Sequence, residues 1–340
     1  MATTTRTAPL STTFASFRHR NYRLWYFGQL ISLVGTWMQN TALGYLVYFL
    51  TGSAAFLGYV GFISGLPSWL FMLYGGVVAD RVPRRVMLIA TQVISMVLAF
   101  ILAALVFTGA IQPWQILILA FLLGITNAFD VPARQSFIVE LVDREDMTNA
   151  IALNATMFNL GAIAGPAMAG ILYALTGPGW CFTINGISFI AVIIALMMMK
   201  IKPVEAPVKS HSALSAIAEG YHYVRNNRLV LTLTLSVFIV NVFGFGLMTL
   251  LPAWAVKILG GDVTTNGWLV SARAVGAVIG GLLIAAYGSR RFRGKMWAAS
   301  SFLLPLMIVG FALTRWIPLS LLMLSGMGLA LVNMLNNSNA

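Results

Sequence analysis

The stretch GVVADRVPRR (residues 76–85) sets one aspartate and three arginines between two long apolar runs. Asp80 and Arg81 follow the first run directly, and Arg84 and Arg85 precede the second. A charged side chain is costly within hydrocarbon, whereas arginine is favoured at the cytoplasmic surface of a membrane. The stretch therefore predicts a short loop that joins two membrane-spanning helices at that surface.

The composition supports a membrane protein. The chain has 340 residues, of which 59% are hydrophobic and 9% are charged, whereas an ordinary soluble domain carries about 25% charged residues. Glycine is frequent, at 31 residues. A single cysteine, Cys181, excludes a disulfide within these residues. This profile is typical of a polytopic membrane protein.

Ten segments are long and apolar enough to cross a bilayer, which takes about 20 residues of helix. They cover residues 24–50, 56–79, 86–108, 112–133, 149–175, 180–200, 229–256, 266–287, 296–314 and 317–335. Strands of a membrane β-barrel would appear as alternating segments of about 10 residues, whereas these runs are longer and continuous. The sequence therefore predicts an all-α membrane protein with ten transmembrane helices.

The connectors between these segments alternate in charge along the chain. Three connectors carry no charge: 51–56, 108–114 and 176–180. Five segments carry most of the basic residues: 18–23, 80–85, 140–146, 200–228 and 290–295. Of the 21 lysines and arginines, only Lys257, Arg273 and Arg315 fall outside the side of the membrane that the basic connectors share. Basic connectors remain in the cytoplasm. We therefore expect a multi-pass protein of the plasma or bacterial inner membrane with a cytoplasmic N-terminus.

The same alternation accounts for the net charge of +12. A nucleic-acid-binding surface is also basic, but its charges would not alternate in step with apolar spans. We therefore expect the lipid bilayer and a small molecule as partners, and no nucleic acid.

The connector between the sixth and seventh segments divides the chain. We expect a cytoplasmic tail (1–23), a six-helix bundle (24–200), a linker (201–228) and a partial bundle of four helices (229–340). Within the linker, Leu214, Ile217, Tyr221 and Val224 recur at helical spacing, which predicts an amphipathic helix on the membrane surface.

The two parts repeat one another. GGVVADRVPRRVM (75–87) ends the second segment, and GGLLIAAYGSRRFRGKM (280–296) ends the eighth, 205 residues later from Gly75 to Gly280. Parallel repeats related by an axis along the membrane normal are typical of one transporter architecture.

The loop that opened the argument resembles the conserved loop of the major facilitator superfamily, Gly-x-x-x-Asp-Arg-x-Gly-Arg-Arg/Lys. It supplies Gly76, Asp80, Arg81, Arg84 and Arg85, with Pro83 in place of the second glycine. Three further stretches resemble the enterobactin-exporter-like and macrolide-efflux-like permeases of that superfamily: 17–53, 127–142 and 149–177. The resemblance implies a two-bundle transporter with ten helices present of an expected twelve. We therefore expect a C-terminally truncated chain, with a ten-span variant as the alternative.

The resemblance also implies a function. It implies a secondary active transporter that exports small amphipathic organic molecules of the drug, macrolide or siderophore type by alternating access, as a monomer. The energy source would be the proton gradient, with no cofactor and no metal. No carboxylate lies in the middle of a span, so proton coupling rests on the resemblance alone.

In the family, the loop forms a cytoplasmic latch. The resemblance implies that Arg84 pairs with an acid on the fourth span, for which Asp130 is the candidate. It implies that Asp80 faces the N-terminus of an eleventh helix. Asp130 and Arg134 could instead form an i,i+4 structural pair.

A run of small residues on the fifth span has two readings. Gly161, Gly165 and Gly170, with Pro166 between them, resemble a motif of exporters and antiporters. Proline removes a helical hydrogen bond and permits a bend, whereas glycines let another helix approach closely. The run is therefore a bend point for transport or a site of tight packing.

Polar and aromatic residues within the spans are candidates for a substrate cavity: Trp37, Gln39, Asn40, Asn127, Asn159, Asn241 and Arg273. A buried amide is costly without a partner, so each could equally make a hydrogen bond between helices. Arg273 either extends outward to the membrane surface or faces the cavity and attracts anionic or catecholate-like groups.

Other classes fit less well. The three histidines, His19, His211 and His222, lie in cytoplasmic segments, and no His-x-x-x-His, Gly-x-Ser-x-Gly or Walker motif occurs. We therefore do not expect an enzyme. A non-transporting or inactive truncated permease that acts as a sensor or scaffold is the alternative function.

Overall fold

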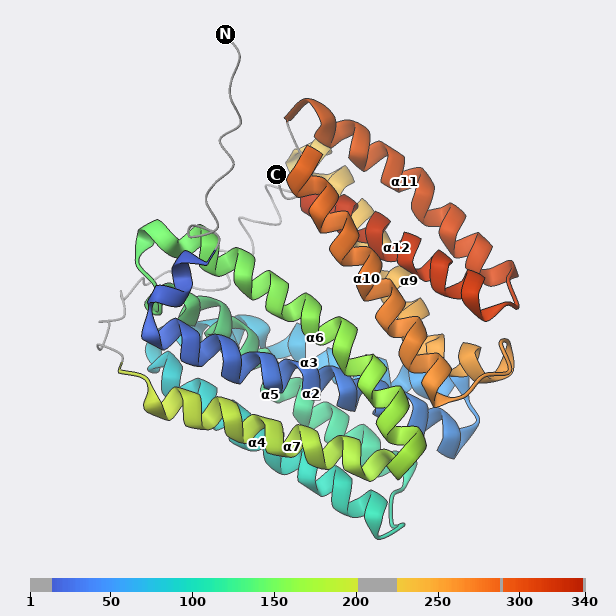
Figure 1. The fold of residues 1–340 in the computed structure, drawn as a ribbon, viewed down its shortest axis with the longest axis horizontal. Helices are drawn as coiled ribbons and strands as arrows, with labels where there is room; N and C mark the ends of the chain where they lie inside the picture. Colours follow the sequence, from blue (N-terminus) through green and yellow to red (C-terminus); the bar gives the residue numbers. More distant parts are fainter. Residues whose placement is uncertain (1–13, 201–224, 288–289, 339–340) are drawn as a thin grey trace.

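The computed structural model describes residues 14–200, 225–287 and 290–338, and within these ranges every regular element is a helix (Figure 1). A first group comprises η1 (Ala15–Arg18), α2 (Arg20–Thr51), α3 (Ala54–Arg81), α4 (Arg84–Phe107), α5 (Pro113–Phe137), η2 (Ile138–Glu140), η3 (Arg144–Asp146), α6 (Met147–Thr176) and α7 (Pro178–Met198). A second group comprises α9 (Arg228–Lys257), α10 (Val263–Tyr287), α11 (Arg290–Leu313) and α12 (Ile317–Ser338). Each predicted apolar segment thus corresponds to a helix.

Eight of the described helices are long and apolar enough to cross a membrane: α3 to α7 and α10 to α12. The predicted count of ten spans is not confirmed for α2 and α9. In α2, buried amides such as Gln29 and Gln39 interrupt the apolar sequence. In α9, only part of the side chains is described. The division into two bundles stays a prediction, and residues 201–224, with the predicted amphipathic helix, lie outside the described residues.

The helices share two ends. Residues 18–23, 81–85 and 140–146 lie at one end, which we call the basic end, and the turns at 52, 109, 177 and 260 lie at the opposite end. These four turns each use a glycine with positive φ, between 61° and 85°, whereas the turn at 314–316, at the same end, contains no glycine. Such values are cheap only for glycine, which commonly terminates helices.

A Thr-Gly pair builds three of these turns. The hydroxyls of Thr51, Thr108 and Thr176 each donate to the carbonyl oxygen four residues earlier, at 2.8 Å. The following glycine then leaves the helix. The uncharged connectors of the sequence are therefore specific helix endings rather than featureless loops.

Glycines let helices pack closely within each group. A Cβ added at Gly124 of α5 would meet Ser64 and Pro67 of α3, and one at Gly328 of α12 would meet Arg273 and Ala277 of α10. These two crossings are separated by about the same interval as the sequence repeat. The repeat therefore appears in the packing as well as in the sequence.

Contacts between the two groups gather toward the opposite end. There α6 packs along α10, and α3 contacts α9. A Cβ added at Gly61 of α3 would lie 3.3 Å from Cγ2 of Thr249, and one at Gly44 of α2 would lie 3.4 Å from Pro252. Figure 1 shows α6 and α10 close together where α10 begins and far apart where it ends. The groups therefore diverge toward the basic end.

Candidate functional site

Asp130 is the centre of a buried polar network between α4 and α5. Its side chain is 3% exposed. Thr91 Oγ1 and Gln92 Nε2 donate to Asp130 Oδ1 at 2.8 and 2.9 Å, and Arg134 forms an ion pair with Oδ2. Every partner donates to the carboxylate, so its negative charge is compensated within the protein. This geometry fits the structural-pair reading of Asp130 and Arg134.

The predicted pairing of Arg84 with Asp130 is wrong in this conformation. Arg84 Nη1 lies 2.5 Å from Glu140 Oε1 instead. The reason is the antiparallel register of α4 and α5. Thr91 is level with Asp130, so Arg84, about 10 Å further along α4, is level with the end of α5, where Glu140 follows. The adjacent Arg85 donates to the carbonyl oxygen of Met197 at 2.8 Å, which ties the loop to α7.

The rest of the loop is placed in part. Arg81 is exposed at the end of α3. The side chain of Asp80 lies outside the described part of the structure, so its predicted role in a latch stays a prediction. A Cβ added at Gly76 would meet nothing within 4 Å, whereas one at the adjacent Gly75 would meet the backbone of Ala128 in α5. The glycine that close packing requires here is therefore Gly75.

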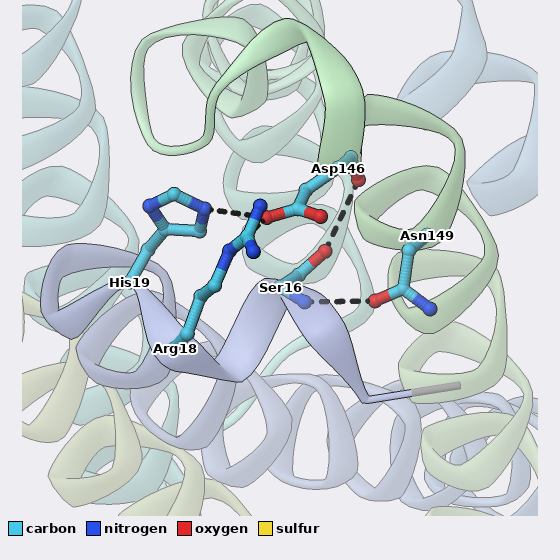
Figure 2. Close-up of polar contacts among 5 residues, drawn as sticks. All are labelled: Ser16, Arg18, His19, Asp146 and Asn149. Atoms are coloured by element: carbon cyan, nitrogen blue, oxygen red, sulfur yellow. Dashed lines mark hydrogen bonds and ion pairs between the residues drawn. The ribbon is translucent and has the colours of Figure 1, made fainter. Parts of the chain in front are cut away.

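A second charged cluster at the basic end was not predicted from the sequence. Figure 2 shows that the side chains of Arg18 and His19, which precede α2, contact the carboxylate of Asp146, just before α6. Arg18 Nε and His19 Nε2 each lie 2.7 Å from Asp146 Oδ2. The only signal in the sequence is an acidic run, 140–146, facing a basic one, 18–23.

Backbone groups complete this cluster. Ser16 Oγ donates to the carbonyl oxygen of Asp146 at 3.2 Å, and Ser16 N donates to Asn149 Oδ1 at 3.0 Å (Figure 2). Tyr22, fully buried, donates to the carbonyl oxygen of Ala150 at 2.9 Å. The cluster fastens the start of α2 to the start of α6.

The small residues of α6 face two neighbours. A Cβ added at Gly161 would lie 3.1 Å from Cβ of Leu33, and one at Gly165 would lie 2.5 Å from Cβ of Trp37, both in α2. A Cβ at Gly170 would lie 2.9 Å from Cα of Thr264 in α10. The carbonyl of Pro166 lies against Gly267 of α10. This part of α6 is therefore tightly packed between α2 and α10, and the predicted bend remains untested.

Two of the cavity candidates lie in contacts between helices. Gln39 is buried, and its Oε1 accepts a hydrogen bond from Asn185 Nδ2 of α7 at 2.8 Å. The ring of Trp37 packs against Phe158 of α6, with 5.5 Å between ring centroids. Gln39 therefore joins α2 to α7, as the alternative reading of the amides allowed.

Three others lie on more open faces. Asn40 and Asn127 are exposed, and Asn159 is half-buried. Asn40 shares a face of α2 with Trp37 and with Gly44, which contacts α9. Asn40 thus points toward the second group of helices. The side chain of Asn241 lies outside the described part of the structure.

Arg273 lies in the middle of α10. None of the ion pairs among the described residues includes it, and its Nε is buried without a hydrogen-bond partner. Among the described residues, no group of three His, Cys, Asp or Glu side chains could hold a metal ion.

Replacing Asp130 by Asn is expected to destabilise the protein by about 2 kcal/mol. Breaking a fully buried ion pair costs about 3–5 kcal/mol, and the Arg134 side chain remains 25% exposed, which reduces the penalty. Thermal unfolding in detergent of Asp130→Asn, Arg134→Gln and the double variant measures the coupling. We expect the double variant to be more stable than the sum of the single losses predicts. Losses of stability that are simply additive in the double variant would contradict a direct interaction between Asp130 and Arg134.

Long apolar helices, an internal repeat and charge clusters confined to one end define a polytopic helical membrane protein of the transporter type. The family model of the transmembrane secretion effectors matches residues 11–340. The chain therefore belongs to this family of the major facilitator superfamily, and the resemblance seen in the sequence is confirmed.

The relatives are transporters and efflux proteins. The chain is 25% identical to a staphyloferrin A transporter of Staphylococcus aureus over 291 residues, which cover 85% of this chain and 72% of that protein. It is 24% identical to macrolide efflux protein A of Streptococcus pyogenes over 293 residues, covering 86% and 72%. It is 26% identical to an enterobactin exporter of Shigella boydii over 277 residues, covering 78% and 63%.

Solved structures support the fold. A crystal structure of a bacterial homolog of the human lysosomal transporter Spinster, in an inward-facing and unoccupied conformation, matches with a TM-score of 0.68. The match covers 94% of this chain and 73% of that chain at 16% identity. At this identity the likeness shows the fold alone.

Proposed function

We propose that this protein is a secondary active exporter of small amphipathic organic molecules, of the drug, macrolide or siderophore type, and not an enzyme. The observation that carries the proposal is the asymmetry between the two ends. Contacts between the helix groups gather toward the opposite end, and the groups diverge toward the basic end. An exporter must accept its cargo from the cytoplasm, and basic residues mark the cytoplasmic side.

In this proposal, all ten long helices span the cell membrane, α2 and α9 included, with the N-terminus in the cytoplasm. Residues 24–200 and 229–340 form two bundles that rock about the contacts between α6 and α10, as alternating access requires. A monomer suffices. Gly170, which lies against α10, supports this motion because it allows a smooth, close contact, whereas Gly161 and Gly165 pack α6 on α2 within the first group.

Cargo would bind between the groups. Asn40, Asn127 and Asn159 supply amides on open faces, Trp37 supplies an aromatic wall, and Asn241 and Arg273 supply polar groups from the second group. Gln39 would act indirectly, by holding α2 on α7. Few polar groups in an apolar site suit an amphipathic organic molecule.

At the basic end, residues 76–85 would act as a latch that stabilises one conformation. Arg84 with Glu140 and Arg85 with Met197 anchor this loop within the first group. Asp80 is then the charge available to a partner in the second group, where a helix N-terminus favours it. We propose the proton gradient as the energy source, with no cofactor.

Transport by the purified chain in proteoliposomes tests the function. We expect a radiolabelled macrolide or siderophore to move across the membrane of the proteoliposomes when a proton gradient is imposed. This transport should stop when an ionophore collapses the gradient. Transport of the cargo that does not depend on the proton gradient would contradict proton coupling but not export. No movement of any cargo, from a folded protein, would contradict export and favour a sensor or scaffold.

A further inference from the structure

Arg273 is a half-buried cation that forms no ion pair with any described residue. It lies ten residues after Val263, about 15 Å along α10, near the middle of the predicted span. Its Nε is buried without a partner. Since a charge within a membrane is costly unless paired, the position calls for an explanation.

The side chain does not extend to the apolar surface of α10. Exposed residues Trp268, Val275, Ile279 and Leu282 follow one side of the helix. Arg273 is on the other side, and shares its face with Leu269, which is fully buried in the core formed with α9, α11 and α12. The arginine is therefore directed away from the exposed apolar side of α10.

Packing does not require an arginine at this position. In the second group, Gly328 of α12 packs on Arg273 of α10, and at the equivalent crossing in the first group, Gly124 of α5 packs on Pro67 of α3. That counterpart is built with an uncharged residue. Close packing of α10 on α12 therefore does not explain why residue 273 is charged.

A second polar atom on the same face also lacks a partner. Asn266, two turns nearer the opposite end of α10, is 1% exposed, and its Oδ1 has no hydrogen-bond partner. A guanidinium binds a carboxylate through two parallel hydrogen bonds, and an amide oxygen accepts from a hydroxyl or N–H group. Among the described residues, one guanidinium nitrogen and one amide oxygen on the same face of α10 thus lack a hydrogen-bond partner.

We propose that Arg273 binds a carboxylate of the exported molecule, so that the cargo is an organic acid that also carries a hydrogen-bond donor for Asn266. This inference rests on the proposed export function. The acid supplies a counter-charge that the described residues do not provide. A neutral analogue of the same molecule would leave the guanidinium unpaired and would bind more weakly.

Binding of dansylglycine and of its neutral amide to the 340-residue chain in nanodiscs tests the proposal, with tryptophan-to-dansyl energy transfer as the readout. We expect the acid to bind more tightly than the amide. Arg273→Met is expected to weaken binding of the acid by about 10- to 100-fold, as loss of hydrogen bonds to a charged group does, and to leave the amide unchanged. Arg273→Lys should retain part of the preference.

The control is Arg144→Met, which removes an exposed arginine at the basic end and should change neither affinity. Thermal unfolding separates binding from folding, since Arg273→Met should not lower the unfolding temperature of the empty protein. Equal binding of acid and amide to the unaltered chain, no binding of the acid, or equal loss of both in Arg273→Met would overturn the carboxylate site.

Uptake of both probes into everted vesicles separates this proposal from export itself. Transport of both probes without an effect of Arg273→Met would retain the exporter and overturn the acid site. Acid-selective binding without transport of either probe would retain the site and count against export.

Discussion

Gly165→Val is expected to leave little stable protein. A Cβ at this position would lie 2.5 Å from Cβ of Trp37, 2.7 Å from the carbonyl oxygen of Val34 and 2.9 Å from the amide nitrogen of Met38. Two of these atoms belong to the backbone of α2, so a change of rotamer cannot relieve the overlap. Overpacking costs about 1–3 kcal/mol for small insertions, and valine adds two further methyl groups. We expect the unfolding temperature in detergent to fall by roughly 10 °C or more.

Gly65→Val is the matched control. Gly65 lies within α3, and a Cβ there would meet nothing within 4 Å. The two substitutions change helix propensity in the same way, so any difference between them reports packing. We expect near-normal yield and unfolding temperature for the control. Similar losses in both variants would show that glycine itself, rather than the contact with α2, accounts for the effect.

Much of this packing could be predicted from the sequence. The apolar runs located each of the ten helices because their lengths match a bilayer, and the Gly-rich run on the fifth span indicated close approach. The sequence did not specify the neighbours. Gly161 and Gly165 contact α2, whereas Gly170 contacts α10, and helical spacing alone cannot assign each glycine to a partner helix.

Charge pairing was harder to predict. The resemblance assigned Arg84 to Asp130, but the register of α4 on α5 brings Glu140 within 2.5 Å of Arg84. Register depends on side-chain packing along the full length of both helices, which a motif of ten residues does not contain. The contact of His19 with Asp146 was missed for a similar reason, since 127 residues separate the partners.

The amides show what spacing within one helix can establish. Gln39 and Asn40 are adjacent in the sequence and were both cavity candidates. One is buried in a hydrogen bond to Asn185, and the other is exposed. Neighbouring residues on a helix are separated by about 100°, so at most one of the two could face a given partner. The sequence could not indicate which.

A disulfide between α3 and α9 is expected to abolish transport. A Cβ at Gly61 would lie 3.3 Å from Cγ2 and 3.5 Å from Oγ1 of Thr249. Cβ of Thr249, one bond behind these two atoms, lies more than 4 Å from the added Cβ, near the upper end of the Cβ separation of about 3.5–4.5 Å that a disulfide requires. The pair Gly61→Cys with Thr249→Cys joins the two helix groups in the half of the molecule that is closed here. Alternating access requires these contacts to part, so the oxidised protein should remain in this one conformation.

The measurement is transport in proteoliposomes before oxidation, after oxidation and after reduction, in a Cys181→Ala background. Cys181 is buried and is the single cysteine of the chain, so its removal leaves the engineered pair as the only source of a disulfide. The single variants Gly61→Cys and Thr249→Cys, oxidised in parallel, control for damage by the oxidant. We expect loss of transport in the pair alone and recovery on reduction. A cross-linked protein that transports at the normal rate would mean that α3 and α9 stay together throughout the cycle, and that the motion proposed for the two groups does not occur.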